Sequence, residues 1–166
     1  VIIEHADLPG TEALKSKDMI IDEAIEVARS LELTFSAFDT GSEINQLNIQ
    51  RELKVTRDLY FVLENAVKAA EMTDGELDVT IAPIMKREGF YEDMPESLLG
   101  MIPDEYVKGG WKKIQFNEEN SAVSLGGNIW VDLSGISKGY IVDMMAKKIA
   151  ESGNVSFIVN AGGDMY

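Results

Sequence analysis

The segment best suited to chemistry runs from Val131 to Tyr140, where an apolar strand leads through a turn of small residues into a helix. Such a junction leaves free backbone N–H groups at the helix start, and Lys138 stands beside them, which suits an anion such as phosphate. The alternative is a capped helix whose Lys138 points into solvent. Asp132, at the end of the strand, either caps the turn or hydrogen-bonds a ligand.

A second candidate is the stretch from Gly75 to Thr80, which carries two acids two residues apart. In a strand, Glu76 and Asp78 would share one face while Leu77 and Val79 faced the core. The acids would then be available to a ligand, or they would form an ordinary solvent-facing acidic edge. The spacing alone leaves both interpretations open.

The third candidate is Ala161-Gly162-Gly163-Asp164, which follows an apolar run. Two glycines allow a ligand to approach the backbone closely, although many strand-to-loop junctions have the same composition. Neither GxGxxG nor GxxxxGK[ST] occurs in the sequence. The two familiar phosphate-loop motifs are therefore absent.

Composition excludes several other chemistries. The chain has no cysteine, which rules out disulfides, thiolate nucleophiles and zinc–thiolate sites, and its one histidine, His5, lies near a terminus. Its 29 acidic and 15 basic residues give a net charge of −14. That charge, spread along the chain, argues against nucleic acid as a partner and predicts a solvated surface.

Hydrophobic spacing predicts the elements that must position these candidates. We expect helices from Asp18 to about Leu33, from Thr56 to Asp74-Gly75, and from about Lys138 to Ser152. The small and polar residues from Phe35 to Asn48 predict a loop. Residues 86–110 show only a weak pattern, which predicts an excursion with one or two helical turns.

The strands are predicted from alternating apolar residues. We expect a short strand over residues 77–81 that ends at Pro83, a three-run antiparallel meander (114–116, 123–125 and 129–133), and a buried strand over residues 155–159. Helices mixed with hairpins in this way favour an α+β fold. The length of 166 residues suits a single domain over residues 1–166.

Taken together and in order, these stretches resemble the ApbE-like family, the FAD:protein FMN transferases. The segments that carry the resemblance are Phe35-Ser36-Ala37-Phe38 with Ser42-Glu43-Ile44 and Leu47-Asn48, Gly75-Glu76-Leu77-Asp78-Val79-Thr80 with Ala82-Pro83-Ile84, Asp132-Leu133-Ser134-Gly135-Ile136-Ser137-Lys138-Gly139-Tyr140 with Asp143, and Ala161-Gly162-Gly163-Asp164. Four ordered blocks are far more specific than any one of them.

The resemblance implies a T-fold-like α+β architecture, a mixed or antiparallel sheet with packed helices. It also implies that FAD is the flavin donor and that Mg²⁺ sits at its pyrophosphate. FMN would pass to a threonine or serine hydroxyl of an acceptor flavoprotein, and AMP would leave. The alternatives are an FAD-binding protein, a relative that hydrolyses FAD to FMN and AMP, and a non-catalytic structural domain.

Carried over by position, the family pattern assigns roles to individual residues. Phe38, Glu76, Leu77 and Asp78 would line the flavin nucleotide, and Asp132 and Lys138 would hold its polar parts. The backbone carbonyl of Gly135 would be a metal ligand. Another wall of the pocket would come from Gly162, Gly163 and Asp164. The resemblance assigns no catalytic residue to this chain.

This sequence also departs from the family pattern. Leu77 stands where phenylalanine is usual, and Arg87-Glu88-Gly89-Phe90 stands where tryptophan usually precedes Gly-Phe. The chain stops at Tyr166, before the family's histidine-containing block and its aspartate and threonine metal ligands. Since Mg²⁺ takes about six oxygen ligands, we expect this chain alone to be inactive or nearly so, with an unpaired strand edge near Val159.

Localisation is weakly constrained. The sequence has no apolar run of about 18 residues and no secretion leader, but it begins at Val1 rather than methionine. Many members of the family work outside the cytoplasmic membrane. The resemblance therefore implies an extracytoplasmic or membrane-associated protein, held through a removed leader or anchor, with a cytoplasmic location also open.

Overall fold

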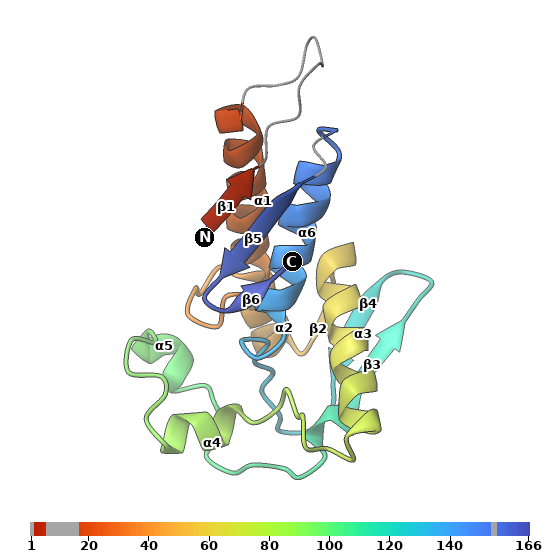
Figure 1. Cartoon of the computed structure of the whole chain (residues 1–166). Helices are drawn as coiled ribbons and strands as arrows, with labels where there is room; N and C mark the ends of the chain where they lie inside the picture. The colour runs from red at the N-terminus through yellow and green to blue at the C-terminus, as the bar shows by residue number, and fades with distance from the viewer. Residues whose placement is uncertain (1, 6–16, 154–155) are drawn as a thin grey trace. The chain divides into compact units, whose positions relative to one another are not determined.

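The protein is represented by a computed structural model that describes residues 2–5, 17–153 and 156–166 (Figure 1). The chain divides into two units, each with a three-stranded sheet and helices of its own. The first unit combines Val1–Glu32 with Ser137–Tyr166, and the second is Leu33–Ile136.

The sheet of the first unit has the order β1-β5-β6, and all its pairs are antiparallel. Its elements are β1 (Ile2–His5), β5 (Phe157–Ala161), β6 (Asp164–Met165), and the helices α1 (Lys17–Phe35) and α6 (Ser137–Ala150), which lie behind the sheet in Figure 1. The two helices pack on β5 through Ala24, Met145 and Val159, among others. Because β5 is the central strand, the predicted unpaired edge at Val159 is wrong.

The second unit contains the remaining elements. They are α2 (Glu43–Gln50), β2 (Glu52–Lys54), α3 (Arg57–Met72), α4 (Ala82–Arg87), α5 (Glu96–Leu99), the 3₁₀ helix η1 (Gly110–Lys113), β3 (Ile114–Asn117) and β4 (Ala122–Leu125). The sheet order is β2-β4-β3, again antiparallel. Tyr60 of α3 packs edge-on against Phe116 of β3, with ring centroids 5.3 Å apart. The mixture of helices and antiparallel strands is the predicted α+β class.

Side-chain caps explain where two of these helices begin. Thr56 caps α3 as predicted, because its Oγ1 accepts a hydrogen bond from the N–H of Leu59 at 3.3 Å. Ser42 caps α2 in the same way, by accepting from Asn45 N at 3.3 Å. The predicted loop over residues 35–48 is therefore wrong in its second half. Ile44 and Leu47, three residues apart, give α2 its buried face.

The ends of the other predicted helices agree with the structure to within a few residues. α3 ends just before Asp74 and Gly75, whose φ angles of 51° and 85° cannot continue a helix. α6 is followed by Gly153 at φ 82°. Of the strand predicted over residues 155–159, Val155 lies outside the described residues, and the observed strand β5 starts at Phe157.

Two predicted strands are absent from the described structure, although the residues are there. Residues 77–81 form turns, because Pro83 opens α4 and Asp78 bonds to its own turn. The run 129–133 is buried but belongs to no sheet, and β2 takes the place that the meander prediction gave it. Alternation of apolar residues therefore predicted strand pairing wrongly in both runs. In residues 77–81 it also predicted burial wrongly, because Asp78 and Thr80 are buried while Leu77 and Ile81 are only half-buried.

Side chains replace the missing strand partner of the run 129–133. The amide of Asn48 donates from Nδ2 to Val131 O and accepts from Val131 N through Oδ1, both at 2.8 Å. The guanidinium of Arg51 donates to Ile129 O at 2.7 Å and to Gly127 O at 2.8 Å. Asp132 N donates to Val79 O at 2.8 Å. These contacts hold the run extended in a buried position where its backbone polar groups need partners.

The segment between α4 and η1 packs tightly despite its weak sequence pattern. It holds one short helix, α5, in agreement with the predicted one or two helical turns, and Tyr91, Met94, Leu98 and Ile102 are buried there against Trp130, among others. This Tyr91 side chain is central to the site described below. The described helices include none that is both long enough and apolar enough to cross a membrane.

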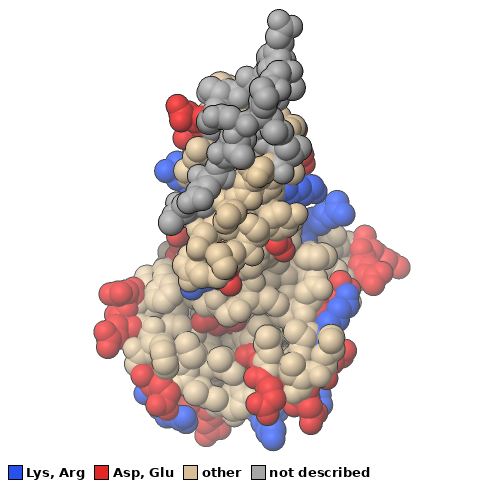
Figure 2. Space-filling model, in the orientation of Figure 1, with Lys and Arg blue, Asp and Glu red and all other residues tan. Residues whose placement is uncertain are grey.

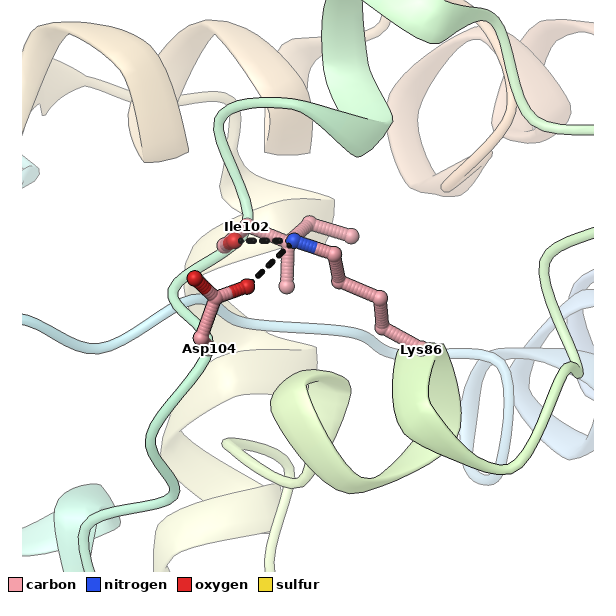
Figure 3. Close-up of polar contacts among 3 residues, drawn as sticks. All are labelled: Lys86, Ile102 and Asp104. Carbon is pink, nitrogen blue, oxygen red and sulfur yellow. Dashed lines mark hydrogen bonds and ion pairs between the residues drawn. The ribbon is translucent and has the colours of Figure 1, made fainter.

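An ion pair pins α4 to the chain that follows α5 (Figure 3). The Nζ of Lys86 donates to Ile102 O at 3.0 Å and to Asp104 Oδ1 at 2.8 Å. The hydrogen bond from Lys86 and its charge lower the pKa of Asp104. Asp104 is exposed, so the ion pair itself adds little stability, but the bond to Ile102 O fixes the path of the chain toward Tyr106.

The surface agrees with the predicted spread of charge. On the face drawn in Figure 2, acidic side chains are distributed over the surface, with basic side chains among them. Two ion pairs of the described residues lie within helices, Arg29 with Glu26 and Lys68 with Glu64 at 2.9 Å. An acidic surface with interspersed pairs explains the excess of Asp and Glu without a binding role.

Asn48 gives a direct test of the fold. We expect Asn48→Ala to lower the free energy of unfolding by about 2–4 kcal/mol, because it leaves the buried N–H and C=O of Val131 without partners. Urea unfolding followed by circular dichroism measures the change. The matched control is Asn65→Ala in α3, whose amide makes a solvent-exposed hydrogen bond to Phe61 O and whose loss should cost less than about 0.5 kcal/mol. Equal losses in the two variants would contradict the role of Asn48.

Candidate functional site

One pocket of about 240 Å³ lies within the second unit, at the junction of two turns. The first turn, residues 76–81, follows α3. The second turn, residues 132–136, begins at the end of the buried run 129–133. The pocket brings together five of the predicted site residues, Glu76, Leu77, Asp78, Asp132 and Gly135. Its other lining residues are Val79, Ile81, Met85, Ser134 and Ile136. Acidic groups and an apolar wall thus face the same space.

Asp78 is 6% exposed and belongs to a turn that its own side chain stabilises. Its Oδ1 accepts from the N–H of Thr80 at 2.8 Å and from the hydroxyl of Thr80 at 2.6 Å. Its Oδ2 accepts from the hydroxyl of Tyr106 at 2.9 Å. Gly110 leaves room for this arrangement, since a Cβ there would lie 2.4 Å from Thr80 Oγ1.

Asp132 repeats this arrangement in the second turn. Its Oδ1 accepts from the N–H of Ser134 at 2.8 Å and from the hydroxyl of the same residue. Its Oδ2 accepts from the hydroxyl of Tyr91. Of the two alternatives raised by the sequence, Asp132 therefore caps the turn. It also lines the pocket at 7% exposed, so a role toward a ligand remains compatible with the cap.

Both tyrosines are held in their protonated form. Burial raises the pKa of Tyr91 far above its ordinary value, and the charge of Asp132 and the hydrogen bond to it act in the same direction. Burial also raises the pKa of Tyr106, and the hydrogen bond to Asp78 reinforces the effect. Near neutral pH each hydroxyl is consequently a hydrogen-bond donor to its carboxylate.

The pocket is acidic. Glu76, Asp78 and Asp132 line it, and none of the described lining residues is Lys or Arg. A bare phosphate would be repelled at this position. Oxygen donors suit Mg²⁺, but within residues 2–5, 17–153 and 156–166 no three Asp, Glu, His or Cys side chains come close enough to hold a metal ion. Among the described residues there is thus no metal site made of side chains alone, and the backbone carbonyl of Gly135 as a metal ligand stays a prediction.

Phe38, predicted to line the flavin, is not among the lining residues, but it contacts Tyr91, which donates to the lining residue Asp132. Its ring meets Tyr91 edge-on, with centroids 6.1 Å apart, and 41% of the residue is exposed. Leu77, which replaces the usual phenylalanine, lines the pocket directly. Both side chains offer apolar surface around the two turns.

The remaining predicted residues belong to the first unit. Lys138 is exposed in the first turn of α6. Gly162 and Gly163, with φ of 66° and 107°, form the tight turn between β5 and β6, and Asp164 begins β6. Gly163 N donates to Asn160 Oδ1 at 3.1 Å. The hairpin explains both glycines structurally, and a place for these four residues at the flavin stays a prediction.

Sequence reasoning missed the tyrosines. Tyr91 and Tyr106 lie in a segment without a clear pattern, and nothing in their neighbourhood marks them as partners of distant carboxylates. A signal did exist for the turns, because Asp78-Val79-Thr80 and Asp132-Leu133-Ser134 share the spacing Asp-x-Ser/Thr. That spacing is typical of a carboxylate that bonds the backbone two residues later.

The fold is α+β, and its candidate site consists of two turn-bound carboxylates that face one pocket. The sequence profile of the ApbE family matches residues 4–166, and the chain belongs to that family. The pocket is built from two of the blocks that carried the resemblance, around Asp78 and around Asp132.

Curated and solved relatives agree with this assignment. The FAD:protein FMN transferase of Haemophilus influenzae is 27% identical over 87% of this chain and 44% of its own length, and that of Vibrio cholerae is 26% identical over 98% and 49%. The chain thus spans about half the length of these relatives.

The solved structures confirm the predicted α+β ApbE architecture. The flavin transferase ApbE from Vibrio cholerae matches with a TM-score of 0.78 at 22% identity, over 97% of this chain and 53% of that one. The ApbE protein from Thermotoga maritima matches with a TM-score of 0.72 at 22% identity, over 90% and 50%.

The raised pKa of Tyr91 has a measurable consequence. Its folded value lies above the value of about 10 in unfolded chains, so its contribution to stability is present below about pH 10 and lost at higher pH. We expect the phenolate absorbance that develops between about pH 9 and 11 to be the same in the parent and in Tyr91→Phe. A variant that lost one tyrosine equivalent of this signal would contradict the buried hydrogen bond to Asp132.

Proposed function

We propose that the protein transfers FMN from FAD to a threonine or serine hydroxyl of an acceptor flavoprotein. The observation that carries the proposal is the pocket, because two blocks typical of the ApbE family meet there around buried carboxylates. The relatives named FAD:protein FMN transferase support it. In the reaction the hydroxyl oxygen bonds to the FMN phosphorus, the phosphoanhydride bond breaks, AMP leaves, and the hydroxyl proton is released.

In this proposal the pocket holds one part of FAD rather than the whole dinucleotide. A volume of about 240 Å³ is below the usual range for a complete ligand site. Leu77, Ile81 and Met85 would pack against the ligand and exclude water. Asp78 and Asp132 would accept hydrogen bonds from its N–H or hydroxyl groups and so fix its orientation.

The pyrophosphate needs positive charge that the lining residues lack. We propose that Lys138 supplies part of it from the start of α6, as its strand–turn–helix sequence predicts. Mg²⁺ remains a proposed requirement for the same electrostatic reason, with ligands beyond those that the described residues provide. An extracytoplasmic or membrane-associated location likewise remains a proposal, based on family resemblance alone.

A transfer assay tests the proposed function. Incubating the full-length protein that contains this chain with FAD, Mg²⁺ and an acceptor flavoprotein that carries a target threonine should give covalent flavin fluorescence on the acceptor and release AMP. The 166-residue chain alone should be inactive or nearly so, as its sequence predicts. Free FMN plus AMP without labelled acceptor would instead support hydrolysis. If the protein neither retains flavin nor shows a rise in melting temperature with FAD, the structural-domain alternative holds. A parallel reaction with EDTA tests the magnesium requirement.

Variants test the assigned residues. We expect Lys138→Ala and Asp132→Ala each to weaken FAD binding by about ten- to a hundredfold, the worth of a charge-assisted hydrogen bond. Flavin fluorescence titration measures the affinity. Lys147→Ala, an exposed lysine in the last turn of the same helix, is the matched control and should bind as the parent does. If Lys138→Ala bound FAD like this control, the phosphate role would be lost.

A further inference from the structure

The two pocket carboxylates share one hydrogen-bonding plan. In Asp78 and in Asp132, Oδ1 accepts both the N–H and the hydroxyl of the residue two positions later. In each, Oδ2 accepts a tyrosine hydroxyl, from Tyr106 and from Tyr91 respectively. Three of about four acceptor positions on each carboxylate are therefore filled by the described residues. One position is left on each, and it lies on the oxygen that the tyrosine holds.

We propose that Tyr91 and Tyr106 are positioning residues that fix the free acceptor position of Asp132 and Asp78 toward the ligand. The proposal rests on the proposed function insofar as the ligand is FAD. The turn holds Oδ1 through two hydrogen bonds, whereas among the described residues the tyrosine hydroxyl is the donor that holds Oδ2 and so restrains rotation of the carboxylate. The preorganised acceptor then loses less freedom when a donor group arrives.

The packing of both tyrosines supports a positioning role. Tyr91 is 4% exposed within the cluster formed by Met94, Leu98 and Trp130, among others, so its ring cannot follow a moving carboxylate. Tyr106 follows the segment that Lys86 pins at Ile102 and Asp104 (Figure 3). Both hydroxyls thus come from one anchored segment of the chain, between α4 and η1, and each reaches a different carboxylate.

The test uses double-mutant cycles in FAD affinity, measured at a temperature where every variant is folded. We expect Tyr91→Phe to weaken FAD binding by about three- to tenfold in the parent background and by less than about twofold in Asp132→Asn, because its effect passes through that carboxylate. Tyr106→Phe should behave in the same way with Asp78→Asn. The crossed pair, Tyr91→Phe with Asp78→Asn, should show nearly independent effects that multiply.

Tyr60→Phe is the matched control for loss of a tyrosine hydroxyl, since Tyr60 packs on Phe116 and does not line the pocket. It should change FAD affinity by less than about twofold. The cognate pairs are those that share a hydrogen bond, Tyr91 with Asp132 and Tyr106 with Asp78. A general loss of stability would weaken FAD binding equally in cognate and crossed double variants, so a contrast between them supports positioning. Independent effects in both cognate pairs, or an unchanged affinity in Tyr91→Phe, would overturn the proposal.

A second measurement separates this proposal from the proposed function. If the parent binds no FAD, the proposed function fails, but the side-chain carboxyl ¹³C signals of the aspartates still report positioning. Tyr91→Phe should then shift the signal of Asp132 and leave that of Asp78 in place, and Tyr106→Phe should do the reverse. Carboxyl signals that respond to neither substitution would overturn the positioning role.

Discussion

The pair of hydrogen bonds between the Asn48 amide and the backbone of Val131 is the constraint on which the site depends. The run 129–133 is buried and pairs with no strand of the described residues, so its polar groups would be costly to leave without partners. Asn48 lies in α2, whose first turn Ser42 caps, and its amide hydrogen-bonds the N–H and C=O of Val131. With the run held extended, Asp132 N reaches Val79 O, and the two turns that line the pocket are brought together.

The same logic of satisfied polar groups explains how two carboxylates remain buried in one acidic pocket. Each aspartate is stabilised by three donors, two from its own turn and one from a tyrosine. Such hydrogen bonds offset the loss of hydration, and the raised pKa values of Tyr91 and Tyr106 ensure that the donors keep their protons. The pocket is thereby prepared to receive hydrogen-bond donors, while anionic groups require positive charge from elsewhere.

Much of this could be predicted from the sequence where local chemistry decides the structure. The cap at Thr56, the helix stop at Asp74-Gly75 and the turn at Asp132 all depend on neighbours within a few residues. The turn at Asp78 is equally local but was predicted as a strand. The prediction failed where distant groups decide. Residues 129–133 alternate as a strand does, yet Asn48 rather than a strand pairs with them. Tyr91 and Tyr106 meet carboxylates 41 and 28 residues away, and no short-range pattern reveals such partners.

The proposed flavin-nucleotide site consists of the two turns around Asp78 and Asp132. Backbone hydrogen exchange with and without FAD, followed by mass spectrometry, tests it most directly. We expect slower exchange on FAD addition in peptides that cover residues 76–81 and 130–136, with no change in the β3–β4 hairpin over residues 114–125. Bound FAD that left both turns unprotected, or that protected only the hairpin, would contradict it.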